Sequence, residues 1–571
     1  MISAGKAAVE ALQAAGVDRI FGLMGSSVLD LYDALYDAKS IRHIGVRDER
    51  AGTHMADAYA RITGRPGVMI AGQSGPGATN LVTGLAQASL AYSPLVVIAG
   101  LPMTQHMGMD SFQEIDQHTL FLPVTKKVID VPTARRIPEL ILEAMRIANT
   151  GRRGPVLLNV ARDLFAEQID VVIKPPRAAP LKAGFVDATT ANEVKQILLS
   201  ARSPALLVGG GVKWERGHER VLRLAEKLEL PIAASSGHGD VVPNDHPLYR
   251  GYAGPAPYGN PVARELLHEA DVILALGTRL GFNTTLYGHD VVPKGAKIIQ
   301  VELDAGAIGK YYPVHMGIVG DATAFAACLC DAIAEKDIRA ITWRARNEEL
   351  ARKWQALWDE RSRVDPHAAS PLQPDQIFRE VNSVMPRNAI VALDSGTLCR
   401  QAADLLRYYE PPALLTPLDF ALVGFGYAAG LGAKVAAPNR PVVSMAGDGG
   451  FGMTVIEICT AVQSGIGSIG IVLDNGCWGA EKAYQRDFYN GRYIAESIVS
   501  PRYDDVARSC GADGYFVSRP GELADAFGQA IKADKPAVIH VKVDPDAIVS
   551  SRKDALKHRV TSAQPSTTKT K

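Results

Sequence analysis

The stretch Val442-Val-Ser-Met-Ala-Gly447-Asp448-Gly449-Gly450-Phe-Gly-Met453 decides the fold class of this chain of 571 residues. Its first half predicts a buried strand, and this strand ends in Gly-Asp-Gly. Open α/β sheets bind ligands at the carboxyl ends of their strands, so we expect Asp448 to face a ligand there. Gly447, Gly449 and Gly450 would let backbone N–H groups approach a phosphate, beside the positive end of the following helix.

A second polar group follows the next predicted strand, Ser468–Leu473. Asn475 closes that strand, and one strand-helix-strand unit separates it from Asp448. The amide oxygen of Asn475 is therefore expected beside the Asp448 carboxylate, at the same edge of the sheet. One carboxylate, one amide oxygen and one backbone carbonyl suit a hard cation such as Mg²⁺ that holds a diphosphate. Gly-Asp-Gly alone is common in turns, so the specificity lies in the pair.

The same alternation of apolar strands and helices occurs three times along the chain. Ala7–Ala15 reads as a helix, and the predicted strands are Ile20–Leu23, Val68–Ala71, Leu95–Ile98 and Val156–Val160, then Ala205–Val208, Ile273–Leu276 and Ile298–Val301, then Ile390–Leu393, Val442–Met445, Ser468–Leu473 and Ala537–Val541. This alternation of strands and helices predicts an α/β protein with three doubly wound parallel-sheet domains.

The predicted organisation is a first domain at 1–175, a central domain at 185–338, a linker at 339–373, a third domain at 374–546 and a tail at 547–571. The connection Pro175–Gly184 has the Pro, Ala and Lys content of an extended segment. The linker at 339–373 carries Trp343, Trp354 and Trp358 at spacings that fit one helix face, which favours a helical strap. The tail is basic and then rich in Ser and Thr, and is either frayed or a lid.

Composition excludes several classes of partner. Lys and Arg together number 61, as do Asp and Glu, so the net charge is zero and neither nucleic acid nor an anionic membrane is expected as a partner. The sequence contains no run of 18 apolar residues, and we expect neither a membrane span nor a signal peptide. Six cysteines without metal-type pairing indicate reduced thiols in a cytoplasmic protein, namely Cys328, Cys330, Cys399, Cys459, Cys477 and Cys510.

The pair Asp448 and Asn475 resembles the diphosphate-binding motif of thiamine-diphosphate-dependent enzymes, in the superfamily of acetolactate synthase and oxalyl-CoA decarboxylase. Two further stretches resemble that family, Arg47-Asp-Glu49-Arg through Gly64 and Ser74-Gly-Pro-Gly-Ala-Thr-Asn80. The resemblance implies pyrimidine-binding, central and diphosphate-binding domains in that order. It also implies that Mg²⁺ is bound by Asp448, Asn475 and the carbonyl of Cys477.

The resemblance makes Glu49 the residue that contacts the aminopyrimidine ring of thiamine diphosphate. A carboxylate against N1′ favours the imino tautomer, which serves as the internal base for the thiazolium C2–H. Without the other motifs, Glu49 would read as a solvated charge at the start of a helix.

Other segments would complete the cofactor site. Val423, in a stretch that resembles the segment beneath the two rings, would be the apolar wedge, or would only pack a helix start. Ser395, Gly396 and Thr397 follow a strand and would add hydrogen bonds to the diphosphate, or form a plain turn.

The residues expected near the substrate come from three segments. Phe112 and Gln113 lie in a stretch that resembles several relatives, with Gln113 reaching the active site unless it is a core glutamine. Ser26 and Ser27 would bind a developing oxyanion, or cap a helix. Trp478-Gly-Ala-Glu481-Lys482 resembles sulfoacetaldehyde acetyltransferases and some 2-hydroxyacyl-CoA lyases, which makes Glu481 a proton shuttle unless it forms a surface pair with Lys482.

The tail segment with Arg552 and Lys553 resembles the end of relatives that use CoA, where basic side chains suit its phosphates, although sulfoacetaldehyde acetyltransferases end in a similar way. The leading prediction is a thiamine-diphosphate-dependent carbon–carbon lyase, a 2-hydroxyacyl-CoA lyase that gives an aldehyde or ketone plus formyl-CoA. The alternatives are a sulfoacetaldehyde acetyltransferase and an acetolactate synthase.

In the central domain, Gly209-Gly210-Gly211, Gly277-Thr-Arg279-Leu and Glu302-Leu-Asp304 would bind FAD, ADP or the adenine of CoA, or are structural turns. The resemblance also implies a homodimer or homotetramer with active sites at the subunit interface. An NAD dehydrogenase is disfavoured, because no Gly-x-Gly-x-x-Gly opens the first helix. A cofactor-binding protein without turnover would be expected to lack Glu49 or the metal pair, and both are present.

Overall fold

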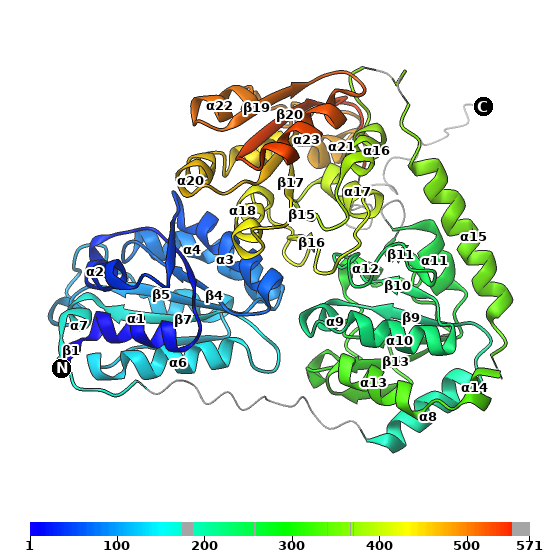
Figure 1. Cartoon of the computed structure of the whole chain (residues 1–571), viewed down its shortest axis with the longest axis horizontal. Helices are drawn as coiled ribbons and strands as arrows, with labels where there is room; N and C mark the ends of the chain where they lie inside the picture. The colour runs from blue at the N-terminus through cyan, green and yellow to red at the C-terminus, as the bar shows by residue number, and fades with distance from the viewer. Residues whose placement is uncertain (174–186, 256–258, 340, 366, 369, 551–571) are drawn as a thin grey trace, which may run out of the picture.

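The structure is a computed structural model that describes residues 1–173, 187–255, 259–339, 341–365, 367–368 and 370–550. Its core consists of three separate six-stranded sheets, in each of which all neighbouring strands are parallel. Helices flank each sheet (Figure 1). The prediction of three doubly wound parallel-sheet domains is therefore confirmed. The connection predicted at Pro175–Gly184 lies outside the described residues.

The first sheet is built from the N-terminal part of the chain. Its strands, in spatial order, are β3 (Arg42–Gly45), β2 (Arg19–Gly22), β4 (Gly67–Ile70), β5 (Leu95–Leu101), β7 (Val156–Ala161) and β6 (Lys127–Asp130). Its helices are α1 (Ala4–Ala14), α2 (Leu29–Asp37), α3 (Glu49–Thr63), α4 (Pro76–Leu90), α5 (Gln117–Phe121), α6 (Ile137–Ala148) and α7 (Arg162–Ala166). A short antiparallel pair, β1 (Ile2–Ser3) with β8 (Gln168–Ile169), joins the two ends of this domain.

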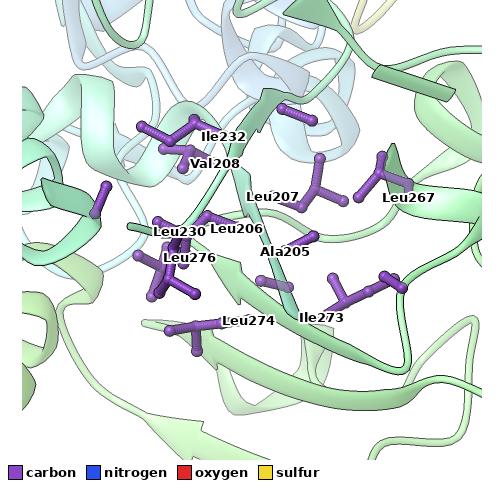
Figure 2. Packing of buried hydrophobic residues seen from close by; sticks show 14 of the residues in the cluster. Ala205, Leu206, Leu207, Val208, Leu230, Ile232, Leu267, Ile273, Leu274 and Leu276 are labelled. Carbon is purple, nitrogen blue, oxygen red and sulfur yellow. The ribbon is translucent and has the colours of Figure 1, made fainter. Parts of the chain in front are cut away.

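The second sheet forms the central domain. Its strands, in spatial order, are β11 (Tyr249–Tyr252), β10 (Ile232–Ala234), β9 (Pro204–Val208), β12 (Val272–Leu276), β13 (Lys297–Glu302) and β14 (Met316–Val319). The helices are α8 (Ala188–Leu199), α9 (Gly210–Trp214), α10 (His218–Leu228), α11 (Pro261–His268), α12 (Phe282–Thr285), α13 (Ala322–Ala332) and α14 (Glu335–Arg339). Both faces of β9 are buried: Figure 2 shows Leu206 and Val208 on one side and Leu207 on the other.

The third sheet carries the stretch Val442–Met453. Its strands, in spatial order, are β16 (Leu414–Leu415), β15 (Ile390–Leu393), β17 (Val442–Gly447), β18 (Ile469–Asp474), β20 (Ala537–Lys542) and β19 (Asp513–Val517). The helices are α16 (Pro374–Val384), α17 (Thr397–Leu405), α18 (Gly426–Ala436), α19 (Asp448–Gly452), α20 (Glu457–Ser464), α21 (Gly479–Phe488), α22 (Tyr503–Ser509) and α23 (Glu522–Ala533).

The three sheets use two strand orders. When the strands of each six-stranded sheet are numbered in chain order, the first and third sheets both run 2-1-3-4-6-5, whereas the central sheet runs 3-2-1-4-5-6. In all three, the order reverses next to the first strand, and such switch points are where open α/β sheets bind ligands. The central order is the one that dinucleotide-binding folds use.

The first and third domains pack through helices α3 and α18, which lie side by side in Figure 1. The approach is close enough to require glycine, since a Cβ on Gly432 of α18 would lie 2.1 Å from the carbonyl oxygen of Met55 in α3. The shared apolar layer contains Ala58 and Ile62 from α3 with Phe425 and Ala429 from the third domain.

A buried ion pair within the central domain holds the third domain through hydrogen bonds. Lys213 Nζ lies 2.8 Å from Asp240 Oδ1, and Asp240 Oδ2 accepts hydrogen bonds of 2.8 Å from the backbone N–H groups of Ala413 and Leu414. Burial raises the pKa of such a carboxyl, but the charge of Lys213 and these hydrogen bonds hold the pKa of Asp240 below its ordinary value.

The linker between the second and third sheets is dominated by α15 (Arg344–Arg361), which runs along the central domain in Figure 1. Trp354 and Trp358 are buried on one face of α15, and Trp343 is buried where the helix begins. All three pack into the core of the central domain, so this segment is a helical strap, as the spacing predicts. Among the described residues, the longest helices lack an apolar stretch that could cross a membrane.

Candidate functional site

The carboxyl ends of β17 and β18 place Asp448 and Asn475 at one edge of the third sheet. These strands are parallel neighbours, with Gly447 opposite Leu473, so the residues that follow them emerge together. Asp448 is the first residue of α19 and is 1% exposed; its Oδ2 accepts a 2.9 Å hydrogen bond from Ser500 Oγ. Burial raises the pKa of Asp448 to about 6, although the hydrogen bond from Ser500 acts to lower this pKa. A bound cation would stabilise the ionised form of such a buried carboxylate.

Asn475 and Thr397 meet at Gly479, the first residue of α21. A Cβ on Gly479 would lie 3.0 Å from Asn475 Nδ2 and 3.5 Å from Thr397 Oγ1. Asn475 Oδ1 accepts from the N–H of Cys477 at 3.4 Å, which folds the loop after β18 back on itself. The structure thus brings together the predicted residues of the third domain from the ends of β15, β17 and β18.

The glycines after β17 are crowded by the expected site residues. A Cβ on Gly449 would lie 2.7 Å from the ring of Trp478, and a Cβ on Gly450 would lie 3.1 Å from Cγ1 of Val423. Next to Gly447, in contrast, a Cβ would meet no atom within 4 Å. The end of β17 therefore has open space beside its last residue, Gly447.

Sequence reasoning missed the role of Asp394, the residue before the predicted Ser395, Gly396 and Thr397. Its carboxylate is 2% exposed and accepts hydrogen bonds from the N–H groups of Gly424 (3.0 Å), Gly426 (2.9 Å) and Ser395 (2.6 Å). Asp394 therefore holds the turn that follows Val423. Its place at the end of β15 was a usable signal, since strand ends carry site residues.

The donors at this edge fit Mg²⁺ bound through a diphosphate. They are hard oxygen atoms: the Asp448 carboxylate, the Asn475 amide and the Cys477 carbonyl. Among the residues that the structure describes, His, Cys, Asp and Glu form no group of three that could hold a metal by itself. A cation here would need further oxygens, and the phosphates of a cofactor supply such oxygens.

Glu49 begins α3 and is 3% exposed. Its Oε1 accepts from the N–H of Gly72 at 3.3 Å, and its Oε2 accepts from Asn80 Nδ2 at 3.0 Å. A Cβ on Gly77 would come within 2.9 Å of Oε1, so the segment Ser74–Asn80 wraps the carboxylate as only small residues allow. Glu49 is thus a held, buried group and not a solvated charge at a helix start.

The two serines predicted to bind an oxyanion differ in the structure. Both belong to a single 3₁₀ turn, Ser26–Val28, in which neither side chain caps the turn. Ser27 is buried, and its hydroxyl accepts from Ser74 N–H at 3.0 Å and donates to the Gly72 carbonyl at 3.4 Å. Ser26 Oγ donates to Gln73 Oε1 at 3.0 Å. The hydroxyl of Ser27 is therefore committed to the loop, and Gln73 joins the set of polar groups here.

The glutamine that enters the core is Gln117 and not Gln113. Gln117 is 2% exposed and connects Gly75 N–H, at 3.2 Å, with Asn159 Oδ1, at 2.9 Å. Gln113 has a positive φ of 63° and packs its backbone against Gly75, where a Cβ would lie 2.3 Å from its carbonyl oxygen. Phe112 beside it is 82% exposed.

Glu481 lies exposed in the first turn of α21. Lys482 does not form the surface pair considered for these two residues; its Nζ bonds the Pro545 carbonyl at 3.1 Å and Asp546 at 3.2 Å. The chain from Asp546 to Ser550 follows α21, and Ser550 Oγ donates to the Ala483 carbonyl at 3.1 Å. Arg552 and Lys553 lie outside the described residues.

A cavity of about 240 Å³ lies at the carboxyl ends of β9 and β12, where the central strand order reverses. Its lining includes Gly210, Gly211, Arg279 and Glu302 from the central domain, Tyr92 and Arg152 from the first, and Asp419 from the third. Arg279 lies 4.6 Å from the ring of Tyr92 and 3.0 Å from Asp419. The predicted glycines are structural as well, since a Cβ on Gly211 would lie 2.7 Å from Cα of Gly277.

Three linked parallel sheets, with polar groups gathered at the carboxyl edges of the first and third, define a class of α/β protein that binds ligands at such edges. Comparison with known proteins identifies the family. Models described as thiamine pyrophosphate enzyme, N-terminal TPP binding domain, central domain and C-terminal TPP binding domain match residues 2–120, 191–329 and 394–541. The chain belongs to the thiamine pyrophosphate (thiamine diphosphate) enzyme family.

Curated relatives match almost the whole chain. A sulfoacetaldehyde acetyltransferase from Alcaligenes xylosoxydans xylosoxydans is 35% identical, over 96% of this chain and 94% of its own. One from Castellaniella defragrans is 36% identical, over 96% and 95%. A probable acetolactate synthase large subunit from Methanococcus aeolicus is 32% identical, over 95% and 92%.

The relatives and the family models confirm the predicted superfamily, and the two TPP binding domains among those models support thiamine diphosphate as the cofactor. The relatives favour the alternative prediction, an acyl- or aldehyde-transferring enzyme, over the leading prediction of a 2-hydroxyacyl-CoA lyase.

Proposed function

We propose that this chain transfers an acetyl group derived from sulfoacetaldehyde to phosphate, with thiamine diphosphate and Mg²⁺ as cofactors. The observation that carries the proposal is similarity to sulfoacetaldehyde acetyltransferases over 96% of the chain. The segment Trp478-Gly-Ala-Glu481-Lys482, which resembles the pattern of those enzymes, supports it further. The reaction balances without an oxidant or reductant, because the carbon–sulfur bond breaks to release sulfite as acetyl phosphate forms.

The proposed roles in the cofactor site come from the resemblance to the family, and the geometry of the first and third domains supports them. Thiamine diphosphate supplies, when bound, a nucleophilic carbon that adds to a carbonyl group. Asp448, Asn475 and the Cys477 carbonyl would bind Mg²⁺, and the N–H groups of Gly447–Gly450 would bind the diphosphate. Ser395, Gly396 and Thr397 would add hydrogen bonds from the neighbouring strand end. Val423 would support the two rings, and Glu49 would bind the aminopyrimidine.

The proposed substrate side is a set of loops around these groups. Ser26 and Gln113 would orient the carbonyl of the substrate, because both are polar and contact the segment of residues 72–77 that holds Glu49. Phe112 and Trp478 would cover it and exclude water, and Glu481 would move a proton to or from the reacting carbon.

We propose that two copies of the chain share each active site, in a homodimer or a dimer of dimers. Large apolar side chains are exposed in the segments that carry the site residues, which supports a covered face. They are Met24 (65% exposed), Met109 (70%), Phe112 (82%), Phe420 (46%), Met453 (43%), Ile456 (51%) and Val499 (102%). These positions flank Ser26, Gln113, Val423, Gly450 and Ser500, so a second copy would cover the site itself.

A nucleotide is proposed as a second ligand, in the central cavity. The strand order 3-2-1-4-5-6 is that of dinucleotide-binding folds, and the cavity lies at its switch point. Release of ADP or FAD from the heat-denatured protein, detected by absorbance and chromatography, supports this site. The proposal is contradicted if the protein releases no nucleotide and if neither ADP nor FAD raises its melting temperature.

The proposed reaction is tested with purified protein, Mg²⁺, thiamine diphosphate, sulfoacetaldehyde and phosphate. Acetyl phosphate and sulfite in equal amounts, absent when phosphate is omitted, support the proposal. Parallel reactions contain pyruvate or a 2-hydroxyacyl-CoA. Acetolactate or formyl-CoA from these, without acetyl phosphate from sulfoacetaldehyde, overturns it in favour of the corresponding alternative.

A further inference from the structure

A series of hydrogen-bonded residues connects, from beneath, the two strand ends that carry Asp448 and Asn475. It starts at Tyr503, the first residue of α22, whose hydroxyl donates to the backbone carbonyl of Asp448 at 2.9 Å. Tyr503 is 4% exposed, and its ring packs edge-on against Phe451 of α19 with centroids 5.1 Å apart. The hydroxyl reaches α19 because residue 452 is glycine: a Cβ there would lie 2.7 Å from the Tyr503 oxygen.

The series continues through His540, which lies in β20 and is 1% exposed. Its Nδ1 accepts from the backbone N–H of Tyr503 at 3.0 Å, a donor that the first turn of a helix leaves without an intrahelical partner. Because Nδ1 accepts, Nε2 carries the hydrogen in the neutral ring and donates to Asp474 Oδ2 at 2.8 Å. The carboxylate of Asp504 lies 4.0 Å from Nδ1 and is itself bonded by Arg502 and Arg508.

Asp474 is the last residue of this hydrogen-bonded series and leads into the loop that carries Asn475. It is the last residue of β18, directly before Asn475, and its Oδ1 accepts from the N–H of Gly476 at 3.0 Å. Lys542 also bonds its carboxylate, at 2.7 Å. A ligand that bridges Asp448 and Asn475 would therefore meet two loops whose relative position is set from below by three buried side chains.

We propose that Tyr503 and His540 are positioning residues that hold the loops of Asp448 and Asn475 at the spacing a metal-bound diphosphate requires. The inference rests on the proposed function of that edge. Neither side chain touches the cofactor in this account; their hydrogen bonds fix two strand ends before the ligand arrives. Such preorganisation raises affinity because less ordering remains to be done on binding.

Tyr503→Phe is the variant that tests this, because it removes one hydroxyl and keeps the packed ring. His540→Gln is a second variant, in which Nε2 of glutamine can still donate to Asp474 while the acceptor for Tyr503 N–H is lost. Tyr427→Phe is the matched control. Its ring lies in the same aromatic cluster, 4.9 Å from Phe451, and its buried hydroxyl has no hydrogen-bond partner among the described residues.

The dissociation constant of thiamine diphosphate is measured at saturating Mg²⁺ by quenching of tryptophan fluorescence, for which Trp478 lies beside Gly449. The melting temperature of each cofactor-free protein is measured as well. We expect Tyr503→Phe and His540→Gln to weaken binding about 10-fold, the size of one net hydrogen bond, and Tyr427→Phe to bind within about twofold of wild type.

Two results overturn the inference, and they are distinguishable. If wild type binds and Tyr503→Phe binds equally well, even with a lower melting temperature, the network is structural only and the inference alone fails. If wild type itself does not bind thiamine diphosphate with Mg²⁺, the proposed function fails and the inference fails with it.

Discussion

At the scale of single residues, Asp394 shows how a buried carboxylate organises the edge of the third sheet that carries Asp448 and Asn475. Its oxygens accept from three backbone N–H groups, two of them in the turn that follows Val423. Asp394→Asn replaces an acceptor oxygen with an NH₂ group that faces these donors. We expect the variant to lose about 1–3 kcal/mol of stability and to bind thiamine diphosphate more weakly. Thermal unfolding and a binding titration measure both.

The control for this variant is Asp375→Asn, because Asp375 forms only an exposed pair with Arg379. It should change stability by less than about 0.5 kcal/mol. An Asp394→Asn protein as stable as this control would contradict the account.

Asp394 also predicts a dependence of stability on pH. Burial raises its pKa to about 6, although backbone hydrogen bonds act to lower that pKa. A raised carboxyl pKa means that the folded state binds the proton more tightly than the unfolded state does. Protonated Asp394 therefore contributes fully to the stability of the folded state below about pH 4, and this contribution is lost as the pH rises through about 6. The difference in melting temperature between wild type and Asp394→Asn should change across pH 4–6 and be constant above pH 6.5.

The sequence predicts motif residues better than it predicts their neighbours. Asp448, Asn475 and Glu49 stand at strand and helix ends that the pattern marks, and the structure finds them there. Gln113 and Gln117 could not be told apart, because Gln113 lies in the loop before α5 and Gln117 begins that helix, and both contact Gly75. The strand end marks the position of Asp394 but not its partners. Asp394 and Ser500 act through contacts between segments far apart in sequence, and no local spacing reveals such contacts.

At the scale of elements, the predicted strands are mainly the interior ones, and the missed strands are mainly at sheet edges. β5, β12 and β15 are continuous apolar runs because helices cover both faces of the sheet around them. β3 and β16 are edge strands: β3 contains Arg42 and His43, and β16 is two residues long. An edge strand has one neighbour and is partly solvated, so its sequence carries a weaker signal.

The contact of α3 with α18 is an element-scale feature that can be tested directly. Gly432→Ala places a Cβ 2.1 Å from the carbonyl oxygen of Met55, so the two helices must move apart. We expect a loss of about 1–3 kcal/mol, measured as a lower melting temperature. In the control Gly528→Ala, in α23, the new Cβ meets no atom within 4 Å. That variant should gain about 0.5–1 kcal/mol, because alanine favours the helix. Equal effects of the two substitutions would contradict the packing described.

At the scale of the whole molecule, the exposed apolar side chains around the site predict that two copies of the chain complete each other. If Glu49 of one copy serves the Asp448 edge of another, inactive variants should rescue each other. In a heterodimer of a Glu49→Gln chain and an Asp448→Asn chain, one of the two sites has both residues intact. Co-expression with different affinity tags, followed by purification on both, should give about half of the wild-type activity per dimer.

The controls are the two homodimeric variants, each of which should be inactive. A heterodimer as inactive as both controls would show that each site lies within one chain. The sequence could not supply this arrangement from composition or spacing, because the proposed surface of contact consists of loops from two domains. Only the resemblance to the family pointed to it.

In the proposed function, Glu49 activates the thiamine diphosphate that this enzyme binds. The most direct measurement compares the turnover of sulfoacetaldehyde by wild type and by Glu49→Gln, at saturating Mg²⁺, thiamine diphosphate and phosphate. Glu143→Gln, which changes a surface pair with Lys127, is the control. We expect the turnover rate of Glu49→Gln to be about 100-fold or more below that of wild type, with thiamine diphosphate still bound. The turnover rate of the control should be unchanged. Turnover by Glu49→Gln at the wild-type rate would contradict the proposed role of Glu49.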